Sequence, residues 1–366
     1  MGICSLLMMG MHTMAQQQTE NLVIVTLDGM RWQEVFGGAD AALMHNSKYT
    51  NDIGGIQHLF GGKTEQEKRQ KLFPFIWNTM AKQGQLYGNR KLGNKVETAN
   101  PYKFSYPGYN EIFTGFPDTA VNSNDKVLNN NTNVLEFINQ QQGYQDKVAV
   151  FATWDVFPYI FNKQRSKLYI NADMDTAHAG SSTMNLVNDM QSLTSKPIDV
   201  RPDIFTYMAA REYMKANQPK VVYIALDETD DFAHHGMYDQ YLRSANAADR
   251  MLSDIWKYIQ SSPYYANRTT LMVTCDHGRG EKDKWVDHGD EIKESGQTWI
   301  AVLGPDTAPM GEVSTKQVIY QKQLAATFAS LLGFEFTANH PVGFQIAGIG
   351  SPTQQTASIK PIGIAK

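Results

Sequence analysis

The sequence is poor in cysteine: the chain of 366 residues contains only Cys4 and Cys275. If the chain is cleaved after Ala15, Cys4 is removed and no intramolecular disulfide can form. Stability must then come from the apolar core and from any bound metal. Hydrophobic residues make up 42% of the sequence, which is enough for a large core.

A dominant charge of one sign is also missing. The 33 basic and 37 acidic residues nearly balance, and no basic stripe of the kind that binds nucleic acid is present. The sequence has no internal repeats and no Pro/Gly/Ser-rich linker, so we predict one large domain over residues 16–366. Composition therefore argues against a nucleic-acid-binding surface and names no other partner.

No apolar run is long enough to span a bilayer, including the short one in the first fifteen residues. Residues 1–15, MGICSLLMMGMHTMA, carry no charge and include a short apolar stretch before Ala15. This pattern predicts a signal peptide, although the usual positively charged start is missing. We therefore expect a secreted or periplasmic protein.

Short, β-branched, continuously apolar runs are abundant, and they are typical of strands covered on both faces. They occupy residues 21–27, 147–153, 220–226, 269–275 and 298–304. Amphipathic helical patterns separate them; the clearest covers 238–259, and others end near Gly84, follow Pro202 or end at Gly333. The alternation predicts an α/β fold, a three-layer α/β/α sandwich with a central, mostly parallel sheet. In such folds ligands bind at the carboxyl ends of the strands.

Acidic residues and histidines follow three of the expected strands. Asp28 follows the first, the segment 227–235 puts four carboxylates and two imidazoles after the third, and Asp276-His277 follows the fourth, with His288 further on. For one histidine alone, a surface position is the better explanation, but the whole set indicates a metal site. Imidazole nitrogen combined with carboxylate oxygen suits zinc, whereas calcium prefers oxygen alone.

Two pairings of acid and histidine are open in the segment 227–235. Asp230 with His234 and Asp231 with His235 have the same i, i+4 spacing. Either spacing lets both side chains of a pair meet one ion from a single helical turn.

A hydroxyl group stands at the start of another helical pattern. Ser105 is followed by Pro107, which suits a first helical turn, and the pattern ends at Thr114-Gly115. A helix N-terminus offers free N–H groups and a positive dipole end that attract phosphate oxygens. On this stretch alone, an ordinary N-cap serine is the better explanation.

The ordered motifs VIVTLDG, FSYPGYNEIFTG, DETDDFAHHG, TCDHGRG and DHGD resemble those of the alkaline phosphatase superfamily, in particular its nucleotide pyrophosphatase/phosphodiesterase-like branch. The resemblance runs from about Asn21 to Gly348. It implies a metal-dependent hydrolase of small phosphate esters, mono or di, with two divalent metal ions: zinc is expected, and manganese is the alternative. By residue matching, one ion would be held by Asp230, His234 and His288, and the other by Asp28, Asp276 and His277, with Ser105 oxygen between them.

The resemblance also assigns the nucleophile. In the branch with a threonine nucleophile a Thr-Gly pair stands nine and ten residues later, as Thr114-Gly115 do after Ser105. Ser105 would form a covalent seryl-phosphate at the two-metal centre. The candidate substrate contacts are Asn124, whose spacing departs slightly from that of the branch, and Arg279, which could equally be a surface arginine beside the site.

Departures from the family patterns bear on the alternatives. Sulfatases of the superfamily carry arginine where this chain has Tyr109, which argues against a sulfatase. The phosphoglycerate mutase branch carries a large inserted domain, whereas the interval 116–220 has room only for a small cap. A non-catalytic binding protein on this fold should have lost a ligand or the nucleophile, and none is missing.

Further residues are expected to support the site. Asp227 and Glu228 could orient ligand histidines. Trp154, Phe157 and Tyr159 could line a leaving-group pocket.

Overall fold

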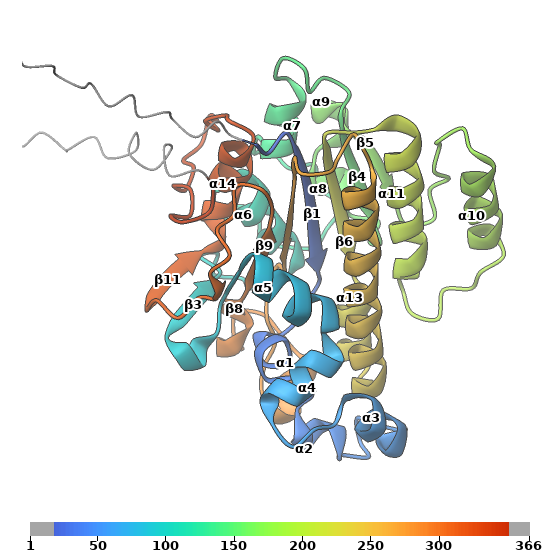
Figure 1. Ribbon diagram of the computed structural model, residues 1–366, viewed down its shortest axis with the longest axis vertical. Helices are drawn as coiled ribbons and strands as arrows, with labels where there is room; N and C mark the ends of the chain where they lie inside the picture. Colours follow the sequence, from blue (N-terminus) through green and yellow to red (C-terminus); the bar gives the residue numbers. More distant parts are fainter. Residues whose placement is uncertain (1–17, 351–366) are drawn as a thin grey trace, which may run out of the picture.

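The computed structural model describes residues 18–350. The predicted signal peptide, residues 1–15, lies outside this range. Within it, a central sheet is covered by helices on both faces (Figure 1). The predicted three-layer α/β/α arrangement is confirmed.

The central sheet has eight strands in the order β10-β2-β9-β7-β1-β6-β4-β5. β1 pairs in parallel with both β6 and β7, whereas β9 runs antiparallel to β2 and β7. The sheet is therefore mostly parallel, as predicted. The strands are β1 (Asn21–Leu27), β2 (Gln85–Tyr87), β4 (Val148–Ala152), β5 (Tyr169–Ala172), β6 (Val221–Leu226), β7 (Thr269–Thr274), β9 (Ile300–Leu303) and β10 (Gly311–Glu312).

A second, three-stranded sheet lies beside it in the order β11-β3-β8. β3 is parallel to β11 and antiparallel to β8. The sequence patterns did not predict these short strands. They are β3 (Asn94–Glu97), β8 (Gln297–Thr298) and β11 (Gln317–Tyr320).

Two apolar cores lie on the two faces of the central sheet. In β1, Val23, Val25 and Leu27 contribute to one core, and Leu22 and Ile24 contribute to the other. Successive side chains of a strand point to opposite faces, so a strand buried on both faces needs apolar residues throughout. The continuous apolar runs of the sequence have this origin.

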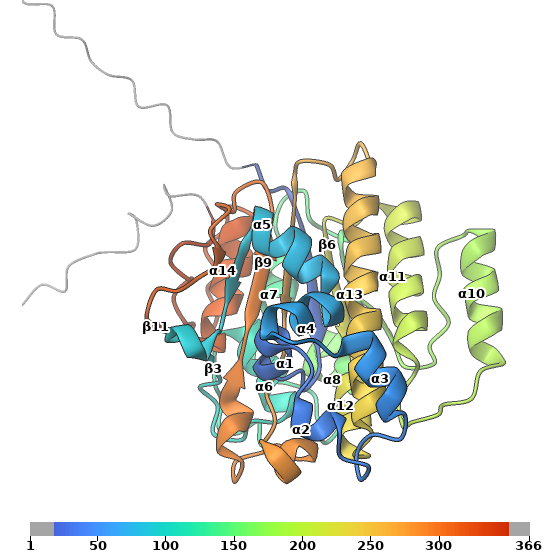
Figure 2. The ribbon, with the colours of Figure 1, turned by 60° about the horizontal axis from the view of Figure 1, so that its bottom comes forward.

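Helices form the two outer layers (Figures 1 and 2). Those packed on the core that contains Val25 are α1 (Trp32–Gly37), α2 (Ala41–Met44), α3 (Ile53–Phe60), α4 (Glu65–Leu72), a π-helical turn η1 (Ile76–Met80) that continues into α5 (Ala81–Gln83), α11 (Asp203–Asn217) and α13 (Tyr238–Ser261). Those packed on the other core are α6 (Ser105–Thr114), α7 (Val134–Asn139), α8 (Phe157–Ile160) and α14 (Leu324–Leu331).

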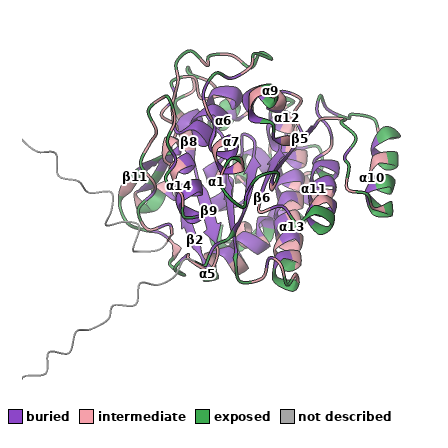
Figure 3. Ribbon diagram, turned by 90° about the horizontal axis from the view of Figure 1, so that it is seen from above, coloured by how far each residue is buried: buried purple, intermediate pink, exposed green. Residues whose placement is uncertain are grey.

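Three further helices lie near the sheet ends and edge: α9 (Lys163–Ser166), α10 (Ser182–Ser192) and α12 (Glu228–His234). α10 lies beyond α11 at the edge of the molecule, with much of its surface exposed (Figure 3). It falls inside the interval 116–220, for which a small cap stays a prediction. No helix among residues 18–350 combines the length and the apolar character needed to cross a bilayer.

Candidate metal centre

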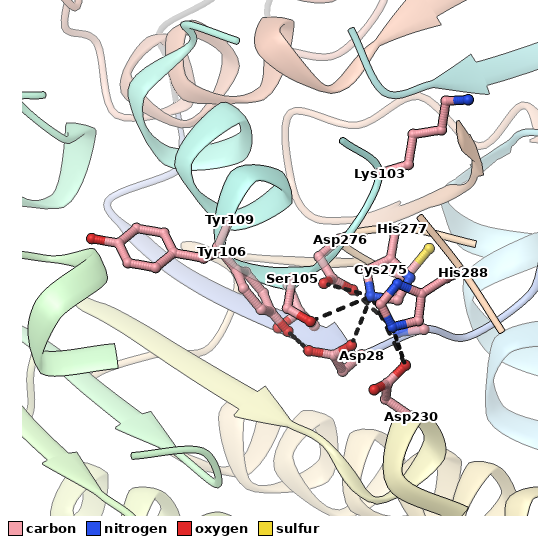
Figure 4. Close-up of polar contacts among 12 residues, drawn as sticks. Asp28, Lys103, Ser105, Tyr106, Tyr109, Asp230, Cys275, Asp276, His277 and His288 are labelled. Atoms are coloured by element: carbon pink, nitrogen blue, oxygen red, sulfur yellow. Dashed lines mark hydrogen bonds and ion pairs between the residues drawn. The ribbon is translucent and has the colours of Figure 1, made fainter. Parts of the chain in front are cut away.

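Polar residues gather where three adjacent parallel strands end. Asp28 follows β1 directly, Asp276 comes two residues after β7, and α12 begins just after β6. Because these strands run in the same direction, their carboxyl ends meet at one edge of the sheet. Figure 4 shows side chains from all three strand ends pointing toward one another around His277.

The first group of candidate ligands is Asp28, Asp276 and His277, which we call the buried group. All three side chains are fully buried. His277 Nε2 lies 3.3 Å from Asp28 Oδ1 and 3.3 Å from Asp276 Oδ2. These two carboxylate oxygens have no hydrogen-bond partner among the described residues. Unpartnered buried oxygens around an imidazole nitrogen are the arrangement that a bound cation would satisfy.

The orientation of His277 fits metal binding as well. Its Nδ1 lies 2.8 Å from the carbonyl oxygen of Gly278, so Nδ1 carries the proton and Nε2 faces the two carboxylates. Burial lowers the pKa of His277, but the carboxylates of Asp276 and Asp28 outweigh it and raise the pKa to about 9. Burial and the Asp28 charge raise the pKa of Asp276 well above its usual range. The pair of carboxylates thus calls for a positive charge between them, which a divalent cation would supply.

The second group is Asp230, His234 and His288, which we call the exposed group. His234 Nε2 lies 2.9 Å from His288 Nε2 and 3.0 Å from Asp230 Oδ2. The side chain of His234 is 41% exposed, in contrast to the buried group. The two groups adjoin each other, because Asp230 Oδ1 is 3.9 Å from His277 Nε2 and the rings of His277 and His288 are stacked with centroids 4.0 Å apart.

The structure separates the two pairings that the sequence left open. Asp230 and His234 face His288, whereas His235 Nδ1 lies 2.8 Å from the backbone oxygen of Asp231 and its ring is exposed. Only the first pairing therefore joins a group of three candidate ligands among the described residues.

Arg279 occupies a different position from the one expected for a substrate contact. It is 1% exposed, and its guanidinium contacts Asp230 and the backbone oxygens of Trp285 and Val286. Although burial raises the pKa of Asp230, Arg279 and His234 hold this pKa well below its usual range. Arg279 is thus neither a surface arginine nor a residue that lines the cavity; it keeps Asp230 ionised and in place.

Ser105 lies next to the buried group, as the resemblance implied. It is the first residue of α6, it is 6% exposed, and its Oγ is 3.4 Å from His277 Nε2. α6 ends at Gly115, whose φ of 71° is the left-handed conformation typical of a helix C-terminus. The hydroxyl therefore stands at a helix N-terminus and within reach of the ligand groups.

Two glycines allow this close assembly. Gly108 in α6 lies against the end of β7, where a Cβ would come within 2.7 Å of the Asp276 carbonyl oxygen. Gly29 has φ of 60°, and a Cβ there would collide with the Asp230 carboxylate. A side chain at either position would displace α6, which carries Ser105, or the candidate ligand Asp230.

Tyr109 has a role that sequence reasoning missed. Its hydroxyl donates to Asp28 Oδ2 at 2.8 Å, which leaves Oδ1 to face His277. Burial raises the pKa of Tyr109 well above its usual range, so the hydroxyl keeps its proton and acts as a donor. The sequence singled out Tyr109 only because it replaces the arginine of sulfatases.

A cavity of about 250 Å³ opens in front of Ser105 and the exposed group. Asn124 lines it and accepts a hydrogen bond from Tyr106 N through Oδ1, while no hydrogen bond of its Nδ2 occurs among residues 18–350. Trp154 lines the cavity as expected, whereas Phe157 is buried in the core. The remaining lining residues are Asp155, Asp173, Asp199, Val200, Asp227 and Asp231.

The acids beside the ligands do not orient the histidines in the way the sequence suggested. Glu228 accepts a hydrogen bond from Asp203 N, and Asp203 in turn accepts from the backbone of Asp227 and Glu228. Burial raises the pKa of Glu228 to about 8 and that of Asp231 to about 7. Such shifts are the response of buried carboxylates that lie close to one another.

Comparison with known structures identifies the fold. The lipoteichoic acid synthase LtaP from Listeria monocytogenes superposes with a TM-score of 0.58 at 12% identity, over 92% of this chain and 76% of that chain. The alkaline phosphatase PafA gives 0.57 at 12% identity, over 92% and 100%, and a 2-O GAG sulfatase gives 0.53 at 12%, over 88% and 72%. The chain thus has the fold of the alkaline phosphatase superfamily.

Comparison of sequences identifies the family. A profile described as type I phosphodiesterase / nucleotide pyrophosphatase matches residues 38–330. The chain belongs to this family, which confirms the branch indicated by the motifs and makes the protein a phosphoester hydrolase. No curated protein sequence matches the chain significantly.

Proposed function

We propose that the protein hydrolyses phosphate mono- or diesters through a covalent seryl-phosphate on Ser105, with one divalent ion held by the buried group and one by the exposed group. Zinc is the expected ion and manganese the alternative, because both groups combine imidazole nitrogen with carboxylate oxygen. The observation that carries the proposal is the position of Ser105 Oγ, 3.4 Å from His277 Nε2 and at the floor of the cavity.

The two ions, when bound, would lower the pKa of the serine hydroxyl and balance the charge of the phosphoryl oxygens and the leaving oxygen. Ser105 Oγ would form a bond to phosphorus as the ester P–O bond breaks, and the alcohol would leave into the cavity. A water oxygen would then form a bond to phosphorus as the P–Oγ bond breaks, so that the phosphate product leaves and a proton from the water restores the Ser105 hydroxyl. The helix fixes Ser105, so little motion is needed to reach the attacking position.

Asn124 is the proposed contact for a phosphoryl oxygen. Its Oδ1 accepts from Tyr106 N at 2.9 Å, which fixes the amide and leaves Nδ2 as the donor. Asn124 and Ser105 line the same cavity. The amide would therefore donate to a non-bridging oxygen of the bound ester.

A sulfatase is disfavoured by the contact between Tyr109 and Asp28 as well as by the family. Tyr109 stands where the sulfatase pattern places arginine, and its hydroxyl is engaged on a candidate metal ligand. The structural likeness to a sulfatase shows a shared fold and does not indicate whether the substrate is a sulfate or a phosphate ester.

Replacement of the nucleophile tests the proposal. Ser105→Ala should lower kcat for bis(p-nitrophenyl) phosphate or p-nitrophenyl phosphate by about three orders of magnitude or more, because covalent attack is lost. Metal content and melting temperature should stay close to those of the parent. The matched control is Ser261→Ala, which removes an exposed hydroxyl at the end of α13.

Two results would contradict the proposal. Undiminished turnover by Ser105→Ala would remove the nucleophile assignment, and a wide preference for p-nitrophenyl sulfate would remove the substrate class. Rapid denaturation during turnover should trap phosphate on a tryptic peptide that contains Ser105. Export, expected from residues 1–15, stays a separate prediction.

A further inference from the structure

Glu111 is a buried acid that the proposed mechanism does not use. It lies on α6, the helix that begins at Ser105, and it is 0% exposed. Burial raises the pKa of Glu111, so an ionised carboxylate at this place costs free energy unless its hydrogen bonds are complete. The hydrogen bonds of Glu111 therefore indicate what the acid does.

The Glu111 carboxylate accepts hydrogen bonds from two separate segments. On one side, the backbone N–H groups of Ala99 and Asn100 and the side-chain Nδ2 of Asn100 donate at 2.8 to 2.9 Å. On the other side, the backbone N–H of Lys322 donates to Oε1 at 2.9 Å. All these partners are donors, which is what an ionised carboxylate requires. Glu111 thus joins α6 to the segment before it and to η5 (Gln321–Gln323), the turn that leads into α14.

Asn100 extends this contact to the turn that leads into Ser105. Its Nδ2 donates to Glu111, while its Oδ1 accepts from the backbone N–H groups of Tyr102 at 3.2 Å and Lys103 at 2.8 Å. Lys103 has φ of 54°, in the left-handed region that residues other than glycine rarely adopt. The Asn100 side chain therefore holds a strained turn in place just before the proposed nucleophile.

The contact with η5 reaches the buried group. Within η5, the side-chain Nε2 of Gln321 donates to the backbone oxygen of Cys275. Cys275 directly precedes Asp276, a candidate ligand of the buried group. α6 also approaches this segment, because Gly108 lies against the backbone oxygen of Asp276. Glu111 thus links the turn before the nucleophile to the strand end that carries the candidate ligands.

The start of α6 needs such support from outside the helix. Its N-cap residue is Phe104, whose side chain has no polar atom to cap the helix. The first turn of a helix frays unless its backbone groups are held. Here the support comes from Asn124, which accepts from Tyr106 N, and from the turn that Asn100 fixes.

We propose that Glu111 and Asn100 are positioning residues that together set where Ser105 Oγ lies relative to the buried group. The inference rests on the proposed function, because it concerns the nucleophile of that site. Neither Glu111 nor Asn100 lines the cavity, so neither touches the substrate. Their loss would displace Ser105 slightly and leave the candidate ligands in place. A displacement of about 1 Å can lower a rate by about a hundredfold.

The binding of vanadate and phosphate reports the position of Ser105 without turnover. Vanadate can take Ser105 Oγ as a fifth oxygen ligand, with the hydroxyl proton passing to a vanadate oxygen, whereas phosphate stays tetrahedral and binds without that bond. The measured quantity is the ratio of the phosphate Kd to the vanadate Kd, determined by calorimetry on the metal-loaded protein. We expect a ratio of roughly 100 or more for the parent and a ratio near one for Ser105→Ala.

Two variants remove the support for Ser105. Glu111→Gln keeps the shape of the side chain but turns one acceptor oxygen into an NH2 group that faces N–H donors. Asn100→Ala removes the link between Glu111 and the turn, and it decides the question should Glu111→Gln fail to fold. Each variant should lower the ratio of the two Kd values roughly tenfold or more, with metal content unchanged. The kcat for p-nitrophenyl phosphate should fall in parallel.

The matched controls are Glu136→Gln on α7 and Asn133→Ala at its N-cap. There too a buried glutamate accepts from an asparagine Nδ2, and the asparagine Oδ1 accepts from a backbone N–H. These two residues hold the start of α7 and not the start of α6. The controls should lower the melting temperature and leave the ratio of the two Kd values unchanged.

The outcomes separate this inference from the proposed function. If Ser105→Ala leaves the parent ratio unchanged, the nucleophile assignment is wrong and the inference falls with it. If the ratio falls in Ser105→Ala but keeps its parent value in Glu111→Gln and Asn100→Ala, the inference alone is overturned. An equal fall in the two controls, or loss of a metal ion from Glu111→Gln and Asn100→Ala, would also overturn it, because the cause would then be general destabilisation or a displaced ligand.

Discussion

The two candidate ligand groups differ most in their exposure to solvent. Asp28, Asp276 and His277 of the buried group are each 0% exposed, whereas in the exposed group the side chain of His234 is 41% exposed and those of His288 and Asp230 are 11% and 10% exposed. The buried group comes from the ends of β1 and β7, which pair along their whole length. The exposed group comes from α12 and from the loop that carries His288.

The difference in exposure implies that this fold would hold two adjacent ions with unequal strength. Ligands at the ends of paired strands are fixed by the sheet and are shielded from competing water. Ligands on a short helix and a loop can move apart at lower cost. We expect the ion of the buried group to belong to the folded core, and the ion of the exposed group to exchange with solvent.

The largest expected effect is the loss of a ligand in the buried group. Asp276→Asn keeps an oxygen that can accept from Gly29 N but removes the charge. Activity should fall by roughly a thousandfold or more, since several kcal/mol of charge stabilisation are lost, and one ion should be missing by elemental analysis. His234→Ala should cause a smaller loss, roughly a hundredfold, because water can take the vacated position. Equal losses of activity and metal in both variants would contradict the expected difference between the two ligand groups.

The two ions should also be released at different rates when metal is removed. A chelator should remove the ions in two phases, with activity lost in the first phase and a decrease in melting temperature in the second. A ligand present at a free concentration of about 100 times its Kd stabilises the folded protein by about 2.7 kcal/mol, and this stabilisation is lost when the ligand is removed. His234→Ala should show the slow phase alone. Release of both ions in one phase would contradict the assignment of the buried ion to the core.

The smallest effect should come from the tyrosine behind the buried group. Tyr109→Phe removes the donor to Asp28 Oδ2 and should weaken metal binding there by roughly 10- to 100-fold, with the exposed group unchanged. Titration with a metal indicator would measure this. The control Tyr265→Phe removes another buried hydroxyl, which donates to Pro219 O far from the site. The same loss in both variants would point to a general destabilisation.

Most of the sheet and the ligand groups could be predicted from the sequence because they depend on local order. Asp28 and Asp276 directly follow apolar runs, and parallel strands bring such positions together at one edge. α11 follows Pro202, and α13 follows its apolar repeat to within two residues of the expected end. These features need no knowledge of distant contacts.

The cavity wall could not be predicted, because it depends on the order of strands. β5 has only four residues, too few to show a clear pattern, so nothing indicated that Asp173 would join Asp155. The burial of Arg279 could not be predicted for a related reason: it follows from contacts with Asp230 and Trp285, which are distant from each other in the chain. Tyr109 was noticed as a departure from a motif, but its partner Asp28 is 81 residues away.

Part of the cavity lining and the candidate ligands occupy different stretches of the chain. Trp154, Asp155, Asp173 and Asp199 lie between β4 and α11, while the six ligand candidates all lie outside that interval. Mutation within the interval can therefore retune which alcohol is accepted while the hydrolytic chemistry is inherited unchanged. A chimera that receives this stretch from a relative should acquire the donor's preference for alcohols as a single module.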